Sequence, residues 1–147
     1  MATTTYSFRD VNGAIVPSNA APFILQGGNL GVGQFVVSND AEHTTHDVSS
    51  DAAVMVSFID NDTGALTIEC QQTSLLDQYL VATFNTLKTL AQSGDSSAWA
   101  AMTILLRNPQ HTHELNGVSF TKIPDRTYTA QGSKLTWKLM AAQVTTL

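Results

Sequence analysis

Residues 54–71 read VMVSFIDNDTGALTIECQ, and this stretch carries the clearest secondary-structure signal in the chain. On both sides of residues 60–64, apolar side chains alternate with small or polar ones, as in strands with one buried face. Residues 60–64 supply turn chemistry between the two runs. The pattern predicts a β-hairpin with one apolar face and one mostly polar face, and Thr67, Glu69 and Gln71 share the polar face.

Further strands are expected on either side of this hairpin. β-Forming residues dominate 5–16, 23–25, 34–38, 100–107, 117–123 and 134–144, and proline or glycine interrupts the chain between several of these segments. In the last segment, apolar Leu135, Trp137, Leu139 and Ala141 alternate with Thr136, Lys138 and Met140. The alternation assigns Trp137 to the core rather than to a sugar-stacking surface.

One helix is predicted, beginning after Ser74 and ending before Gly94. Ser74 and Asp77 resemble a capping box, and apolar residues then recur at helical spacing. The face expected to pack on the sheet comprises Leu76, Tyr79, Leu80, Phe84 (or Thr83), Leu87 and Ala91. These elements predict a mainly β fold, a single-domain β-sandwich or small barrel over residues 1–147, with about 6–8 strands and one flanking α-helix.

Charge is distributed unevenly along the chain. Arg9 is the only basic residue before Lys88, so residues 10–87 hold nine carboxylates and no lysine or arginine. Residues 88–147 hold six basic side chains against three carboxylates. Charged residues make up only 13% of the chain, which favours extensive self-association because buried interfaces are depleted of charge. A neutral β-rich domain that only needs to be soluble has the same composition.

Residues 39–51 contain almost no large apolar side chain, and they predict an exposed loop or an extended hairpin arm. Candidate residues for contacts between subunits through this arm are Asp40, Glu42, His43, His46, Asp47 and Asp51.

No metal or cofactor is expected. Residues 60–64 open like a calcium loop, but the fifth and twelfth positions, Gly64 and Gln71, supply none of the ligands that an EF-hand needs there, so a turn is favoured. The histidine pairs His43/His46 and His111/His113 have no cysteine beside them.

No enzyme is expected either. Serine, histidine and carboxylates are present, but none lies in a nucleophile elbow, and no carboxylate spacing singles out a glycosidase pair. The glycines of residues 27–33 lack the helix and the lysine of a phosphate-binding loop.

The single Cys70 excludes an internal disulfide and is expected to be a small buried hydrophobe. The first residues carry no basic and apolar secretory signal, and no run of eighteen apolar residues occurs. These features predict a protein that is soluble in the cytoplasm and does not insert into a membrane.

Three segments together resemble the tail tube proteins of contractile-tailed bacteriophages. They are Tyr6-Ser7-Phe8-Arg9-Asp10-Val11, then Gly64-Ala65-Leu66-Thr67-Ile68 continuing to Gln72-Thr73-Ser74, and finally Val118-Ser119-Phe120-Thr121-Lys122-Ile123-Pro124-Asp125 with Tyr128, Gly132 and Leu135-Thr136-Trp137. The similarity runs in order from end to end of the chain. It implies a subunit of a hexameric ring, with rings stacked into a hollow tube inside a contractile sheath, and it makes the type VI secretion tube protein a relative in fold.

The resemblance also implies partners and a location. The partners are further copies of the chain, sheath, baseplate and tail terminator proteins, and DNA that passes without specific binding; the location is the virion, with assembly in the host cytoplasm. A wall that binds phosphates would retard DNA, so the channel is expected to be acidic or neutral, with Thr67, Glu69 and Gln71 lining it. An exposed arm can add strands to a neighbouring subunit. A monomeric carbohydrate- or ligand-binding β-sandwich and another virion or secretion-tube subunit remain as alternatives.

Overall fold

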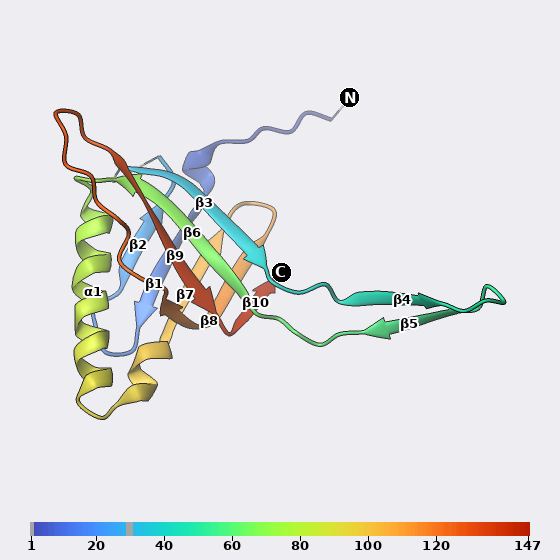
Figure 1. Cartoon of the computed structure of the whole chain (residues 1–147). Coiled ribbons are helices and arrows are strands. Elements are labelled where there is room, and N and C mark those ends of the chain that lie inside the picture. The colour runs from blue at the N-terminus through green and yellow to red at the C-terminus, as the bar shows by residue number, and fades with distance from the viewer. Residues whose placement is uncertain (1, 29–30) are drawn as a thin grey trace.

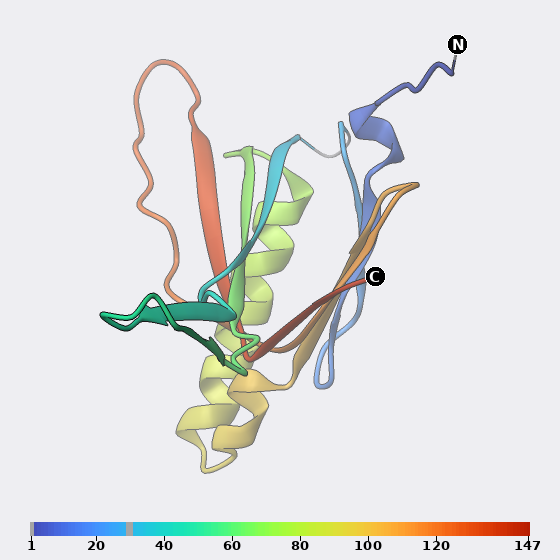
Figure 2. The same cartoon turned by 90° about the vertical axis from the view of Figure 1, so that its right-hand side faces the viewer.

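The fold is a β-sandwich of two twisted layers that share one long strand (Figures 1 and 2). The computed structural model describes residues 2–28 and 31–147. In those residues the strands are β1 (Asn12–Pro17), β2 (Phe23–Gln26), β3 (Val32–Asn39), β4 (Thr44–Val48), β5 (Val54–Phe58), β6 (Gly64–Gln71), β7 (Met102–Arg107), β8 (Thr112–Phe120), β9 (Lys134–Ala141) and β10 (Gln143–Thr146). The helices are η1 (Phe8–Asp10), α1 (Leu75–Gln92) and η2 (Ser96–Ala100).

Strand β8 joins the two layers. Its first part pairs with β7 and β10, and its last residues pair with β9, so the order across the sheet is β2-β1-β7-β8-β9-β6-β3. Gly117 lies between Asn116, which pairs with β10, and Ser119, which pairs with β9, and it has a φ of 63°. A Cβ at this position would lie 2.8 Å from the Cβ of Ala142, so glycine is required both for the backbone conformation and for the close approach.

The predicted mainly β fold with one flanking helix is confirmed, although ten strands occur in the described residues rather than the expected 6–8. The edge strands β2 and β3 do not pair with each other in the part of the chain described, so the sandwich is open and not a closed barrel. The predicted strand 134–144 is divided at Ala142 into β9 and β10.

The hairpin predicted over residues 54–71 is wrong. Strand β5 pairs with β4, from Val48 opposite Val54 to Thr44 opposite Phe58, whereas β6 pairs with β3 and β9. The tight turn therefore lies between β4 and β5, and residues 60–63 only connect this projecting hairpin to β6 (Figure 1). Local alternation predicts a strand, but it does not determine which strand will be the partner.

Helix α1 begins as predicted. The Ser74 hydroxyl accepts a hydrogen bond from the backbone N–H of Asp77 at 3.1 Å, and the core-facing residues include Leu76, Leu80 and Leu87. The reciprocal half of a capping box is not formed. The Asp77 carboxylate instead turns inward, where Trp137 Nε1 donates to its Oδ1 at 3.0 Å.

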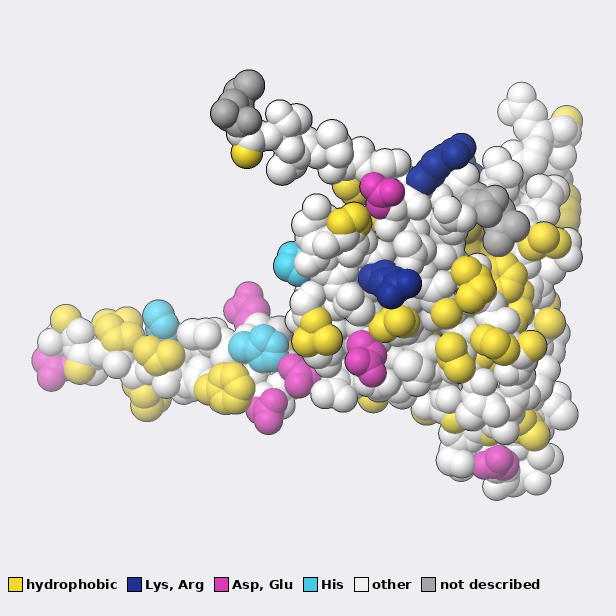
Figure 3. All heavy atoms as spheres, turned by 180° about the vertical axis from the view of Figure 1, so that it is seen from behind, with side chains coloured by type: hydrophobic (Ala, Val, Ile, Leu, Met, Phe, Trp, Pro, Cys, Tyr) yellow, Lys and Arg dark blue, Asp and Glu magenta, His cyan; other side chains and the backbone are white. Residues whose placement is uncertain are grey.

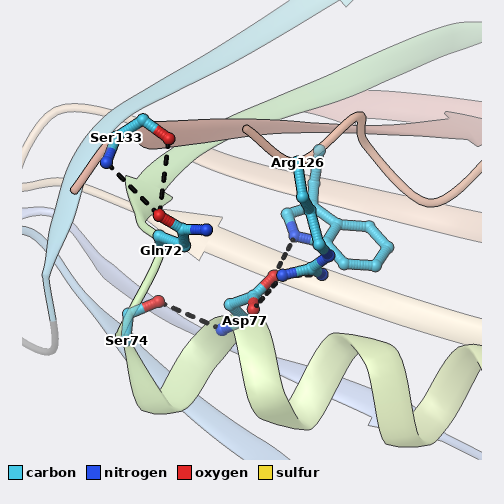
Figure 4. A network of polar contacts seen from close by, with 6 residues as sticks. Gln72, Ser74, Asp77, Arg126 and Ser133 are labelled. Atoms are coloured by element: carbon cyan, nitrogen blue, oxygen red, sulfur yellow. Dashed lines mark hydrogen bonds and ion pairs between the residues drawn. The ribbon is translucent and has the colours of Figure 1, made fainter. Parts of the chain in front are cut away.

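Arg126 completes this buried network and ties three parts of the chain together (Figure 4). Its guanidinium donates two hydrogen bonds to the Asp77 carboxylate, at 2.8 and 2.9 Å. Residues 121–133, which carry Arg126, join β8 to β9, so a long connection without strand structure is fastened to the first turn of α1 and to Trp137 of β9.

The interior is apolar and aromatic. Trp137 is fully buried, as predicted, and its ring lies edge-on to Phe120 with centroids 5.7 Å apart. Phe84 of α1 and Trp99 of η2 extend this cluster, with centroids 5.5 Å apart. Cys70 is buried as expected, and burial raises the pKa of its thiol, so it is not an activated nucleophile.

Replacing Leu80 or Leu87 with alanine is expected to destabilise the protein by about 2–5 kcal/mol, because both side chains are fully buried and each change leaves a cavity. The exposed Leu75 at the start of α1 is the matched control, and Leu75→Ala should cost well under about 1 kcal/mol. Urea unfolding of the three variants measures the difference. Equal stabilities for Leu75→Ala and Leu80→Ala would contradict this packing of α1.

Candidate assembly surfaces

The polar side of the layer β3-β6-β9 forms one broad exposed surface, here called the polar face. Adjacent strands place Gln34, Val36 and Ser38 of β3, Thr67, Glu69 and Gln71 of β6, and Lys134, Thr136, Lys138 and Met140 of β9 on it. The opposite side of the same strands carries the core residues. The three residues predicted to line a channel therefore do lie together on one surface; whether that surface lines a channel stays a prediction.

The charge of the polar face differs from the sequence-based expectation. Lys138 pairs with Thr67 across the ladder, and Lys134 pairs with Gln71. The Nζ of Lys134 lies 3.5 Å from Oε1 of Glu69. The polar face thus carries one carboxylate, paired with Lys134, and a second lysine, Lys138. Its net charge is +1, whereas an acidic or neutral surface was expected. Sequence reasoning missed this because β9 lies more than sixty residues after β6 in the chain.

The acidic residues gather elsewhere, on the hairpin of β4 and β5 and the segments that lead to it. These residues 40–63, here called the arm, project from the body of the molecule (Figures 1 and 2). They contain six of the nine carboxylates of residues 10–87, namely Asp40, Glu42, Asp47, Asp51, Asp60 and Asp62, and no lysine or arginine. The expected extended hairpin arm over residues 39–51 is thus present, and it is longer than predicted.

The arm has one apolar side that the described residues of its own chain leave largely uncovered. Cross-strand pairing places Val48, Val54, Val56 and Phe58 on the same side. Each of these side chains is more than half exposed, and Phe58 is 77% exposed. An isolated two-stranded hairpin is marginally stable in water, and an exposed apolar face of this kind is a candidate interaction surface.

His43 holds the root of the arm. Its Nδ1 lies 2.8 Å from the carbonyl oxygen of Ile59, its ring stacks on Phe58 with centroids 6.3 Å apart, and its Nε2 lies 3.8 Å from Oδ1 of Asp62. The backbone N–H of Asp40 also donates to the carbonyl of Thr63 at 2.9 Å. These contacts join the two segments where the arm leaves the body.

His46 lies on β4 opposite Val56, whereas His111 and His113 contact the C-terminal residues. Nδ1 of His113 lies 2.9 Å from Oγ1 of Thr146, and Nδ1 of His111 lies 3.3 Å from the carbonyl oxygen of Leu147. Burial lowers the pKa of His113, and the neighbouring His111 lowers it further. In the described part of the chain, no three histidine, cysteine, aspartate or glutamate side chains come close enough to hold a metal ion.

The connection 60–63 shows turn chemistry rather than a cation site. Oδ1 of Asn61 accepts hydrogen bonds from the backbone N–H of Thr63 at 3.1 Å and from its hydroxyl at 2.9 Å.

None of the helices in the described residues combines the length and hydropathy needed to cross a membrane.

Comparison with known proteins identifies a family. The model of the family described as "Bacteriophage PhiTE tail tube protein" matches residues 1–147. A search of curated proteins finds no match.

Three solved structures share the fold at low sequence identity. A chain in the anti-feeding prophage (AFP) baseplate aligns with a TM-score of 0.59 at 16% identity, over 100% of this chain and 97% of that one. A chain in the AFP tube terminating cap aligns with a TM-score of 0.53 at 8% identity, over 100% of this chain and 93% of that one. A chain in the sheath/tube terminator of the extracellular contractile injection system PVC, in its extended state, aligns with a TM-score of 0.54 at 12% identity, over 100% of this chain and 99% of that one.

Proposed function

This chain belongs to the bacteriophage PhiTE tail tube protein family, and from that premise we propose that six copies close into a ring and that rings stack into a hollow tube. The chain is a structural component of the phage tail and not an enzyme. Its fold is one that also occurs in the baseplate, cap and terminator of contractile injection systems.

The arm is the main observation that supports self-assembly. It presents uncovered apolar side chains on a hairpin that leaves the body, so its stable state requires a second chain. The open edges of β2 and β3 add backbone groups that can pair between subunits. A head-to-tail interface whose rotation closes gives a ring, and unsatisfied surfaces on the ring's two ends propagate a filament.

We infer that the polar face is turned toward the channel and that sheath, baseplate and terminator proteins contact the tube outside the channel. The polar face is the broad, water-exposed side of the layer β3-β6-β9, and with its single Glu69–Lys134 pair it offers DNA few unpaired positive charges. DNA passes through without being retained because each neutralised phosphate that a wall offers would add counterion-release affinity. Sheath, baseplate and terminator proteins meet the tube from outside or at its ends, after assembly in the host cytoplasm.

The purified chain is expected to form rings or hollow tubes, spontaneously or when seeded with baseplate components. Sedimentation measures the assembled mass, and negative-stain electron microscopy shows the hollow cross-section. An unseeded sample that stays monomeric reports only slow nucleation. A chain that stays monomeric over a wide range of concentration and salt in the presence of seeds contradicts the proposed function.

A further inference from the structure

A groove runs between β3 and the ends of β7 and β8, below the turn η1. Its aromatic and aliphatic lining residues are Tyr6, Phe8, Val11, Phe35, Val37 and Leu106, and Asn108 and His113 add polar groups beside them. The rings of Phe8 and Phe35 lie 5.8 Å apart, and Tyr6 is 76% exposed at the edge of the groove. We call this surface the aromatic groove.

Two arginines lie beside the aromatic groove. Arg107 lines the groove itself, and it also lines a neighbouring hollow together with Arg9 and the carboxylate-bearing Asp10, so the hollow holds two positive charges and one negative charge. Nε of Arg107 donates to Oδ1 of Asn12 at 3.0 Å. Neither arginine forms an ion pair within the described residues. The region therefore combines an apolar floor with unpaired positive charge at its rim.

The arm has the complementary character. Its apolar side, with Phe58 as the largest exposed side chain, needs an aromatic or aliphatic surface, and aromatic side chains in apolar pockets dominate interface energies. Its charges are all negative, and Glu42, which precedes β4, forms no ion pair in the part of the chain described. Figure 3 shows the arm with its mixture of hydrophobic and acidic side chains, and the basic side chains on the body of the molecule.

The arm and the groove of one chain do not meet. The arm leaves the body beyond the ends of β3 and β6 and points away from it (Figures 1 and 3). Contact between the two surfaces therefore joins two copies, and because arm and groove are different surfaces, the contact is head-to-tail and can be repeated.

We propose that the arm of one copy lies in the aromatic groove of a second copy, with its apolar side on the groove floor and Glu42, at the root of the arm, near Arg9 and Arg107. This inference rests on the proposed assembly, and it identifies the surface that receives the arm. Phe58 enters the groove as the anchor, and the charges fix the orientation of the arm and steer the encounter.

Site-specific photo-crosslinking tests the contact in assembled tubes. The photoreactive analogue p-benzoylphenylalanine replaces Phe58, the tubes are irradiated, and the linked peptides are identified by mass spectrometry. Crosslinks from position 58 to residues 6–11, 35–37 or 106–113 of another copy are expected. Crosslinks confined to other surfaces of the neighbouring copies overturn the inference while leaving the tube, and so the proposed function, intact.

A charge exchange gives an independent test. Arg107→Glu is expected to raise the concentration needed for assembly at least tenfold, and Glu42→Lys should do the same. Combining the two substitutions should restore assembly toward that of the unmodified chain, most clearly at low salt. Lys88→Glu, on the exposed side of α1, makes the same change of charge and should have no effect.

The outcomes separate this inference from the proposed function. Circular dichroism and thermal unfolding first establish that each variant folds. If Arg107→Glu does not fold, the crosslinking experiment alone decides the inference. The docking of the arm in the groove is overturned if Arg107→Glu assembles like the unmodified chain, or if the double variant Glu42→Lys/Arg107→Glu assembles no better than either single variant. Failure of the unmodified chain to assemble with seeds overturns the proposed function instead.

Discussion

Asp77→Ala is expected to destabilise the protein by about 3–5 kcal/mol, the cost of removing one partner of a buried ion pair. The substitution leaves the guanidinium of Arg126 and the indole N–H of Trp137 without their acceptor. Trp137 is fully buried, so its N–H cannot turn to water. The side chain of Arg126 is 21% exposed and can rotate outward, which places the expected value toward the lower end of the range.

Asp125 provides the matched control. Its carboxylate is 3.8 Å from Lys122 and almost fully exposed, so Asp125→Ala should change the free energy of unfolding by less than about 0.5 kcal/mol. A double-mutant cycle of Asp77→Ala and Arg126→Met should give a coupling energy above about 1 kcal/mol, because each residue is the other's partner. Additive losses in urea unfolding would show that the network does not hold residues 121–133 to the helix.

Glu69→Lys is expected to slow or arrest DNA ejection from phage particles that carry it. The polar face of each subunit changes from one carboxylate and two lysines to three lysines, a step from +1 to +3. Repetition around every ring multiplies the change, and each phosphate that a lysine neutralises adds affinity through counterion release. The delay should grow as the salt concentration falls, because screening then weakens.

Asp125→Lys makes the same change of charge away from the polar face and should leave ejection unaltered. Fluorescence of a DNA-binding dye outside the particle follows ejection in time, and mass spectrometry establishes that the tails contain the variant. Normal kinetics at low salt in Glu69→Lys particles would remove Glu69 from the channel wall. Loss of tube assembly would place Glu69 in a contact between subunits.

Local signals in the sequence predicted the elements better than their partners. The helix followed from Ser74 and the 3.6-residue spacing of its leucines, and the burial of Trp137 followed from the alternation in β9. Both depend on neighbours within a few residues. The pairing of β5 with β4 was missed because residues 44–48 contain one large apolar side chain, Val48, and so give no alternation that predicts a strand. The alternation in β5 does not say which neighbouring segment is its partner.

For the candidate surfaces, too, the sequence predicted what depends on residues close in the chain and missed what depends on residues far apart in it. The shared face of Thr67, Glu69 and Gln71 was predictable because strand periodicity fixes it. The lysines opposite them come from β9, and the partner of Asp77 comes from residues 121–133, so neither was visible locally. The resemblance to tail tube proteins is confirmed by the family match over the whole chain. It could be seen in the sequence because it rested on the order of several segments rather than on one motif.

Cryo-electron microscopy of the assembled tube tests the central claim most directly, since it shows both the symmetry and the surface that faces the channel. We expect six-fold rings stacked around an open channel, with β3, β6 and β9 of every copy turned toward it and Glu69 and Lys134 at its wall. A solid fibre, a ring that does not contain six copies, or a channel lined by α1 would contradict the account.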